Sequence, residues 1–153
     1  EEARAAVERY GPLVYRLALA QTHSAHDADD VFQEVFLRYV RGAPDFTEEE
    51  HRKAWLLRVT AHCCKTLRGS FWNKHTVSLS EAIPAQNEGE GELLELLDAL
   101  PEKYRSVLHL YYYEGYATDE IAAILGRRAA TVRSQLSRGR ALLRDAWKGA
   151  EDV

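Results

Sequence analysis

The feature that most restricts the fold is a pair of helical patterns separated by one glycine, "TDEIAAILGRRAATVRSQL", at residues 118–136. Small alanines precede Gly126, where two helices must approach closely, and Val132 and Leu136 follow it at the spacing of one buried face. This order of short helix, glycine turn and longer helix is typical of a helix-turn-helix. We expect Thr118 to cap the first helix, although Ile121 stands where a capping box would need Glu or Gln.

Positive charge is concentrated in the same part of an otherwise acidic chain. The formal net charge of the whole sequence is −4, yet residues 126–148 hold seven Lys or Arg and a single acid. Residues 76–98, in contrast, carry six acidic side chains and no basic one. The average charge therefore conceals a basic C-terminal surface that follows an acidic middle.

The buried face assigned to the second helix determines which side chains point outward. With Val132 and Leu136 inward, the helical repeat turns outward the four residues Arg133, Ser134, Ser137 and Arg138. Such side chains suit base edges in a major groove, and the amides near Thr131 suit a phosphate. We assign phosphates of the backbone to Arg127, Arg128 and Arg140. A basic helix that is merely solvated remains the alternative.

Helical periodicity also covers the rest of the chain, and no segment alternates as a strand would. We expect a helix over 1–22 that is interrupted at Gly11-Pro12, and one over 24–41 capped by Ser24. A third helix should span 47–70, with Thr47 and Glu50 as its capping box. The predicted fold is all-α, with two small helical domains (1–75 and 92–153) joined by a flexible acidic linker, 76–91.

Composition excludes several classes of protein. Hydrophobic residues make up 46% of the chain, which is ordinary for a globular protein. No apolar run is long enough for a membrane span and no signal peptide is visible, so we expect a cytoplasmic protein without membrane insertion. The only cysteines are Cys63 and Cys64, which cannot form a disulfide framework.

A metal site or a nucleophilic enzyme is the weaker interpretation of the His62-Cys63-Cys64 sequence. Adjacent helical residues point about 100° apart, so these side chains do not converge on one ion or form an acid–base pair easily. We therefore expect no metal, no cofactor and no enzymatic activity, and we expect both thiols to be structural. The enzyme remains an alternative that thiol alkylation can test.

Two separate parts of the chain resemble one family. The segment "LPEKYRSVLHLYYYEGYATDEIAAILGRRAATVRSQLSRGRALLR" resembles region 4 of bacterial sigma factors, most closely the extracytoplasmic-function group. The segments "YGPLVYRLAL", "DADDVFQEVFLRYVR" and "AWLLRVTAHCCKTLRGSFW" resemble region 2 of that group. The resemblance covers almost the whole chain in matching order, and it implies a factor that directs RNA polymerase to promoters.

In region 4 the resemblance implies that the minus-thirty-five element is read at the positions of Arg133, Ser134, Ser137 and Arg138. Gln135 stands where the family commonly has Arg or Lys, which either removes a phosphate contact or adds an amide that can read adenine. The family also implies that the polymerase flap contacts three positions, Leu100, Leu108 and Tyr112, although a purely structural role is equally open for them.

In region 2 the resemblance implies that the polymerase docks on the polar residues Asp30, Gln33 and Glu34. It also implies that the minus-ten element is melted and captured at five positions, Phe46, Arg52, Lys53, Arg58 and His62. Phe46 can wall a pocket for a flipped base. His62 replaces the Asn that the family commonly has, so the identity of the captured base stays open, and Trp55 is assigned to the core.

The implied partners are core RNA polymerase, promoter DNA and an anti-sigma factor, with a monomer expected when the protein is free. Free protein should bind promoters poorly, because the polymerase sets the separation of the two reading domains. Two rivals remain open. A stand-alone helix-turn-helix regulator would bind its operator without polymerase, and a degenerate relative would bind a partner without supporting transcription.

Overall fold

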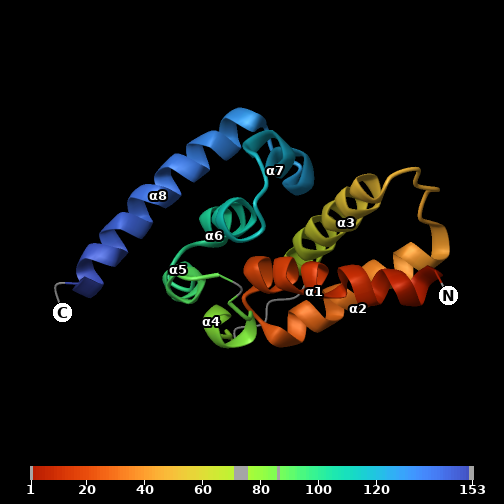
Figure 1. The fold of residues 1–153 in the computed structure, drawn as a ribbon, viewed down its shortest axis with the longest axis horizontal. Helices are drawn as coiled ribbons and strands as arrows, with labels where there is room; N and C mark the ends of the chain where they lie inside the picture. Colours follow the sequence, from red (N-terminus) through yellow and green to blue (C-terminus); the bar gives the residue numbers. More distant parts are fainter. Residues whose placement is uncertain (1, 71–75, 86, 152–153) are drawn as a thin grey trace. The chain divides into compact units, whose positions relative to one another are not determined.

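The computed structural model describes residues 2–70, 76–85 and 87–151, and all regular elements within these ranges are helices (Figure 1). The chain divides into two compact units, Glu1–Thr76 with Ile124–Gly126 and Val77–Ala123 with Arg127–Val153. The expectation of an all-α fold is confirmed. The expected end of the first domain, His75, lies outside the described residues.

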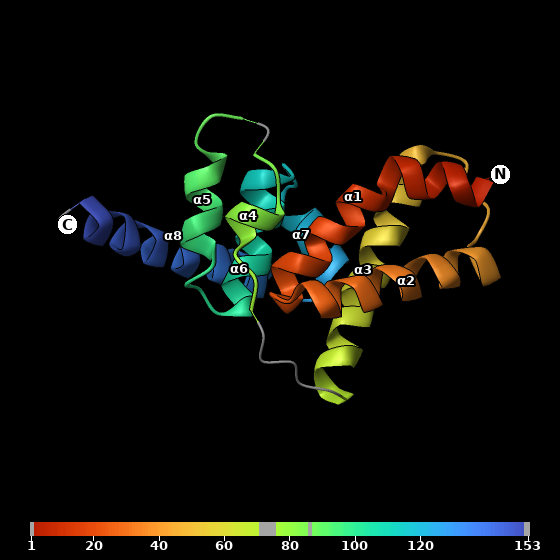
Figure 2. The ribbon, with the colours of Figure 1, turned by 90° about the horizontal axis from the view of Figure 1, so that it is seen from below.

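The first unit is a bundle of α1 (Glu2–Thr22), α2 (Ala25–Gly42) and α3 (Glu49–Ser70). Helices α1 and α2 run side by side, and α3 crosses and contacts both (Figure 2). Its core contains fully buried side chains from every helix: Val14, Leu17, Val35, Leu56 and Leu57. Each helix therefore contributes one apolar face to a shared interior, as the sequence periodicity indicates.

The interruption that we expected at Gly11-Pro12 does not occur, because α1 continues through Pro12. Proline in a helix interior loses one backbone hydrogen bond and costs roughly 3 kcal/mol. Tyr10, Leu13 and Val14 flank this point and are all buried, so tertiary packing stabilises the helix across it. A Cβ at Gly11 would lie 3.4 Å from the Phe32 ring, so the glycine lets α2 pack closely on α1 here.

The ends of α2 and α3 agree with the sequence in part. Ser24 caps α2 as expected, because its hydroxyl accepts a hydrogen bond from the Asp27 amide at 3.2 Å. Helix α3 begins at Glu49, two residues later than we expected, and its cap is one residue later than Thr47. The carbonyl of Glu48, rather than that of Thr47, accepts the first helical bond, from the Arg52 amide. The helix ends at Ser70, as the Gly-Ser pair indicates.

The helical elements that follow are α4 (Leu79–Ala82), α5 (Glu90–Leu97), α6 (Glu102–Leu108), the π-helical turn η1 (His109–Tyr113), α7 (Thr118–Leu125) and α8 (Ala129–Glu151). All belong to the second unit except the last two residues of α7. Helix α6 packs along α8, and α5 contacts α4, η1 and α8. A Cβ at Gly139 would lie 2.9 Å from a methyl group of Leu108. Glycine at this position therefore allows the close approach of α8 to α6.

The stretch 76–91, expected to be a linker without structure, instead contributes a short segment to the second unit. Leu79 and Ile83 are 0% and 1% exposed. The Asp98 carboxylate accepts a hydrogen bond from the Leu79 amide at 2.9 Å, and the Tyr113 hydroxyl donates to the Pro84 carbonyl. These contacts hold residues 79–84, which we call the docked strap, against helices that follow it in the sequence.

Candidate nucleic-acid interface

The helix-turn-helix expected from the sequence is formed by α7, Gly126 and α8. Gly126 has a φ of 67°, a left-handed conformation that glycine adopts without strain. The Ile121 amide bonds to the carbonyl of Ala117, and the Ala117 amide donates to the Glu120 carboxylate at 2.8 Å. The cap of α7 is therefore Ala117, one residue before Thr118, and Glu120 supplies half of a capping box.

Helix α8 presents the face that its apolar spacing indicates. Val132 and Leu136 are 0% and 5% exposed. The four residues predicted to face outward are all exposed, namely Arg133, Ser134, Ser137 and Arg138, and Thr131 beside them is exposed as well. The orientation of the second helix is thus confirmed, and one face of α8 offers two guanidinium groups and three hydroxyl groups to a ligand.

A hollow of about 370 Å³ adjoins this face, lined by Lys103, Tyr104, Ala130, Thr131, Ser134, Gln135 and Arg138. The ammonium of Lys103 lies 5.1 Å from the centre of the Tyr104 ring, so α6 adds a cation to a surface that α8 alone seemed to form. Sequence reasoning missed both α6 residues. They are separated from α8 by more than twenty positions, and no periodicity links them to it.

Two arginines assigned to phosphates have protein partners in this structure. Arg127 lies 3.2 Å from the Glu102 carboxylate and donates to the Gln135 amide oxygen at 2.9 Å. Arg140 donates to the Tyr112 hydroxyl at 2.7 Å, and its guanidinium carbon lies 5.2 Å from the centre of the Tyr111 ring. Arg128, the third arginine of that group, is exposed.

The three residues assigned to the polymerase flap have different environments. Leu100 and Leu108 are 7% and 0% exposed and belong to the core, whereas Tyr112 is 44% exposed. Tyr112 borders an apolar hollow of about 380 Å³ together with Leu143 and Trp147 of α8. The sequence alone did not indicate a role for Trp147, because this residue lies outside the helix-turn-helix pattern.

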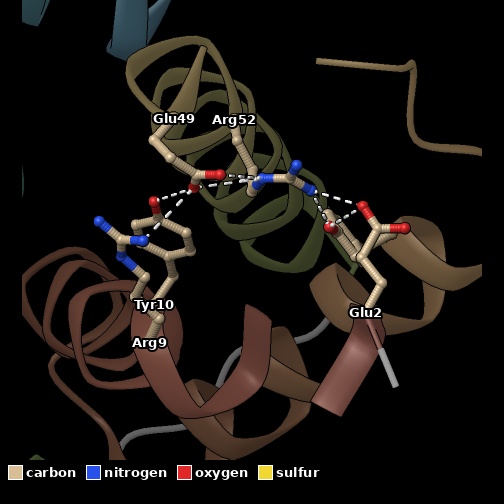
Figure 3. Close-up of polar contacts among 6 residues, drawn as sticks. Glu2, Arg9, Tyr10, Glu49 and Arg52 are labelled. Carbon is tan, nitrogen blue, oxygen red and sulfur yellow. Dashed lines mark hydrogen bonds and ion pairs between the residues drawn. The ribbon is translucent and has the colours of Figure 1, made fainter. Parts of the chain in front are cut away.

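In the first unit, Arg52 lies at the centre of a polar cluster that joins α1, α2 and α3 (Figure 3). Its guanidinium donates to Glu2 at 2.8 Å, lies 3.3 Å from the Glu49 carboxylate and donates to the Tyr39 hydroxyl. The Tyr10 hydroxyl donates to the other side of Glu49. Arg52 is therefore engaged by protein groups on several sides.

The electrostatics of this cluster follow from its hydrogen bonds. The hydrogen bond from Arg52 lowers the pKa of Glu2, and the one from Tyr10 lowers the pKa of Glu49. Burial, followed by the bond to Glu49, raises the pKa of Tyr10 to about 12. Burial also raises the pKa of Tyr39. The cluster thus keeps its carboxylates ionised and its tyrosines protonated near neutral pH.

The remaining residues assigned to the minus-ten element surround this cluster. Phe46 lies under the Arg52 guanidinium at 5.0 Å and edge-on to Trp55, with ring centres 6.0 Å apart. Trp55, which we assigned to the core, is only half-buried, and its ring also lies edge-on to Tyr39. On α3, Arg58 and His62 are exposed one turn apart, while Lys53 is half-buried.

The polar residues assigned to polymerase docking lie along α2. Asp30 and Gln33 are exposed, and Glu34 accepts a hydrogen bond from Arg38 at 2.8 Å. Asp30, Glu34 and Arg38 share a hollow of about 220 Å³ with Cys63 of α3. Sequence reasoning missed Arg38, although its position four residues after Glu34 indicates an ion pair.

The cysteines do not have the features of an enzyme site. Cys63 and Cys64 are both buried and are not paired with each other. Burial raises the pKa of the Cys63 thiol, which lowers the fraction of reactive thiolate. Among the helices of the described ranges, none is both long and apolar enough to cross a membrane.

Family models match both units of the chain. The model described as "Sigma-70 region 2" matches residues 6–70, and the one described as "Sigma-70, region 4" matches residues 90–143. Two solved structures have a similar fold. One is CnrH in complex with the cytosolic domain of CnrY, with a TM-score of 0.66, 23% identity and coverage of 96% of this chain and 88% of that chain. The other is the sigma factor RpoE with the anti-sigma factor NepR from Bartonella quintana, with a TM-score of 0.64, 20% identity and coverage of 95% and 96%.

Curated relatives are similar along most of this chain. The ECF RNA polymerase sigma factor SigE of Mycolicibacterium smegmatis is 31% identical over 91% of this chain and 59% of its own length. The probable RNA polymerase sigma factor RfaY of Xanthomonas campestris is 31% identical over 86% of this chain, which spans only 37% of that protein. The ECF RNA polymerase sigma factor SigM of Mycobacterium tuberculosis is 29% identical, with coverage of 88% and 71%. With a region 2 unit followed by a region 4 unit that ends in this helix-turn-helix, the chain belongs to the extracytoplasmic-function group of the sigma-70 family of RNA polymerase sigma factors.

Proposed function

We propose that this protein binds core RNA polymerase, reads the minus-thirty-five element with α8 and captures the opened minus-ten element with α3 and the residues before it. The observation that carries the proposal is the exposed row on α8, where Arg133, Ser134, Ser137 and Arg138 lie opposite the buried Val132–Leu136 face. Arginine and hydroxyl side chains at these positions suit base edges and neighbouring phosphates.

At the minus-thirty-five element we assign base contacts to Arg133 and Arg138 and phosphate contacts to Arg128 and Lys103. The hollow between α6 and α8 gives Lys103 access to the same ligand as Arg138. Thr131, in the first turn of α8, adds a hydroxyl beside amides that favour an anion. Arg140 becomes available to a phosphate when it leaves Tyr112.

At the minus-ten element we assign the wall of a base pocket to Phe46, which Arg52 and Trp55 hold in position from two sides. We assign the sugar-phosphate backbone of the opened DNA strand to exposed cations of α3 and of the residues before it, such as Arg58. His62 lies one turn from Arg58, where its ring can contact a displaced base.

Polymerase contacts are assigned to both units. In the first, Asp30 and Gln33 offer exposed polar groups on α2, beside Glu34. In the second, Tyr112 and the neighbouring Trp147 offer an exposed aromatic surface. We assign the cytoplasm as the place of action and a monomer as the free state. Sigma factors are initiation factors without catalytic activity of their own.

Control by an anti-sigma factor is part of the proposal. Its support is the similarity in fold to RpoE of Bartonella quintana, which was solved with the anti-sigma factor NepR. Such a partner would inhibit by covering the surfaces that polymerase needs. In this protein those are the Asp30–Gln33 surface and the aromatic surface around Tyr112.

The test is run-off transcription with core polymerase and promoters selected from a random pool. The unmutated protein should select two elements, and Arg138→Ala should lose about 1–3 kcal/mol of discrimination at one base of the upstream element. Arg144→Ala, on the same helix beyond the reading face, is the matched control. A protein that binds DNA tightly without polymerase would indicate a stand-alone regulator, and absence of any transcription would contradict the proposed function.

A further inference from the structure

The side chain of Gln135 is held in one orientation by Arg127. The Nη1 group of Arg127 donates to Oε1 of Gln135 at 2.9 Å and to the Lys103 carbonyl at 3.1 Å. Its Nη2 group lies 3.2 Å from Glu102. Arg127 therefore joins the turn before α8, the start of α6 and the one residue of the reading helix that departs from the family pattern.

Chemistry leaves no ambiguity about which end of the amide faces Arg127. A guanidinium has five donors and no acceptor, so the Gln135 atom that it contacts must be the carbonyl oxygen. The amide nitrogen of Gln135, with its two donor hydrogens, and the second lone pair of the oxygen remain for a ligand. Gln135 lines the hollow that it shares with Ser134 and Arg138, both on the proposed reading face.

The contact is supported by neighbouring groups that hold Arg127 in place. Its side chain is 20% exposed and that of Glu102 is 16% exposed, so solvent screens the pair less than a surface ion pair. The Ser106 hydroxyl donates to Glu102 at 2.9 Å, and the Arg127 amide bonds to the Ala122 carbonyl at 3.0 Å. Both ends of the pair are thus fixed before DNA arrives.

This arrangement changes what Gln135 can recognise. A glutamine that reads adenine uses both ends of its amide, because the oxygen accepts from N6 and the nitrogen donates to N7. Arg127 uses one of the two lone pairs of the Gln135 oxygen and fixes the direction of the amide, so Gln135 keeps one acceptor site and two donor hydrogens in a set orientation. Gln135 can therefore read only a base edge that fits this orientation.

We propose that Arg127 is a positioning residue that fixes the orientation of the Gln135 amide toward DNA, and that Arg127 thereby sets the base preference of α8. This inference rests on the proposed function, since it concerns how α8 reads a promoter. It replaces the assignment of Arg127 to a phosphate.

The experiment measures transcription by core polymerase and the full chain on promoters that carry each of the four bases at every position of the upstream element. The unmutated protein should show a base preference at one position that Gln135→Ala removes. Arg127→Ala should weaken this preference by roughly fivefold or more, the lower end of what a good base contact provides. The double variant Arg127→Ala, Gln135→Ala should have the same preference as Gln135→Ala alone.

Glu102→Gln is the second variant, because it weakens the hold on Arg127 without altering α8. It should shift the preference in the same direction by a smaller factor, and thermal denaturation establishes that each variant is folded. Arg128→Ala is the contrast: an exposed arginine beside Arg127 should change affinity for all sequences alike and reduce the salt slope by about 0.9.

Two results would overturn the inference. One is an Arg127→Ala protein that is folded, retains its base preferences and behaves as Arg128→Ala does. The other is a Gln135→Ala protein that is folded and keeps every base preference of the unmutated protein. Either result leaves promoter-dependent transcription intact, whereas failure of the proposed function would abolish transcription by the unmutated protein with every promoter.

Discussion

Replacing Arg52 should separate support of the proposed minus-ten pocket from contact with DNA. Although Arg52 was assigned to DNA from its family position, its side chain is only 15% exposed and its guanidinium faces Glu2, Glu49 and Phe46. We expect Arg52→Ala to destabilise the first unit and to displace Phe46. Arg58→Ala, an exposed position on the same helix, should leave stability unchanged.

The expected loss of folding free energy in Arg52→Ala follows from the contacts of the Arg52 side chain. Its guanidinium over the Phe46 ring contributes about 1 kcal/mol. The two methylene groups removed by the change to alanine contribute about 0.8 kcal/mol each when buried. The side-chain entropy that alanine does not lose offsets about 1 kcal/mol of this. The expected loss is therefore about 1–2 kcal/mol, and the ion pairs to exposed carboxylates add a part that disappears at high salt.

The measurement is chemical denaturation of the three proteins, followed by near-ultraviolet circular dichroism, since Trp55 and Phe46 lie beside Arg52. Arg52→Lys should recover part of the loss, because ammonium keeps the charge without the planar contact. The reasoning is refuted if Arg52→Ala and Arg58→Ala have the same stability. It is also refuted if Arg52→Ala lowers only the salt dependence of promoter binding.

Three further predictions follow from other contacts. Because folding raises the pKa of Tyr10 to about 12, the first unit should hold its stability below pH 10 and lose about 2–3 kcal/mol as pH rises from 10 to 12; Tyr10→Phe should remove this loss in denaturation curves measured across that range. Leu79→Ala should release the docked strap, seen as faster amide exchange at Leu79 and Ile83 with unchanged exchange in α8. Gly126→Ala should cost about 1–2 kcal/mol in thermal denaturation, because φ is 67° there, and Gly126→Asn should cost less.

The sequence predicted best those features that depend on residues close together in the chain. The turn at Gly126, the Ser24 cap and the inward line from Val132 to Leu136 each follow from a pattern within a few residues. For the same reason the outward face of α8 was predicted in full. Such local patterns can be recognised in the sequence from the helical spacing of apolar residues.

Long-range contacts explain what was missed. The continuation of α1 through Pro12 depends on packing against other helices, which overrides the local penalty. The engagement of Arg52 by Glu2 joins residues fifty positions apart, and that of Arg127 by Glu102 joins residues twenty-five apart. A charged residue alone in a sequence gives no sign of whether a carboxylate from another helix will reach it. Arginines at family positions for DNA were therefore assigned to DNA.

The docked strap limits how far apart the two units can move. A chain spans at most about 3.5 Å per residue. The strap is held from Leu79 onward, so nine peptide steps connect Ser70 to it, a reach of about 32 Å; a strap free as far as Glu90 would leave twenty steps, a reach of about 70 Å. We expect the interaction of Leu79, Ile83 and Asp98 to act as a releasable tether, whose free energy sets how often the longer reach is available.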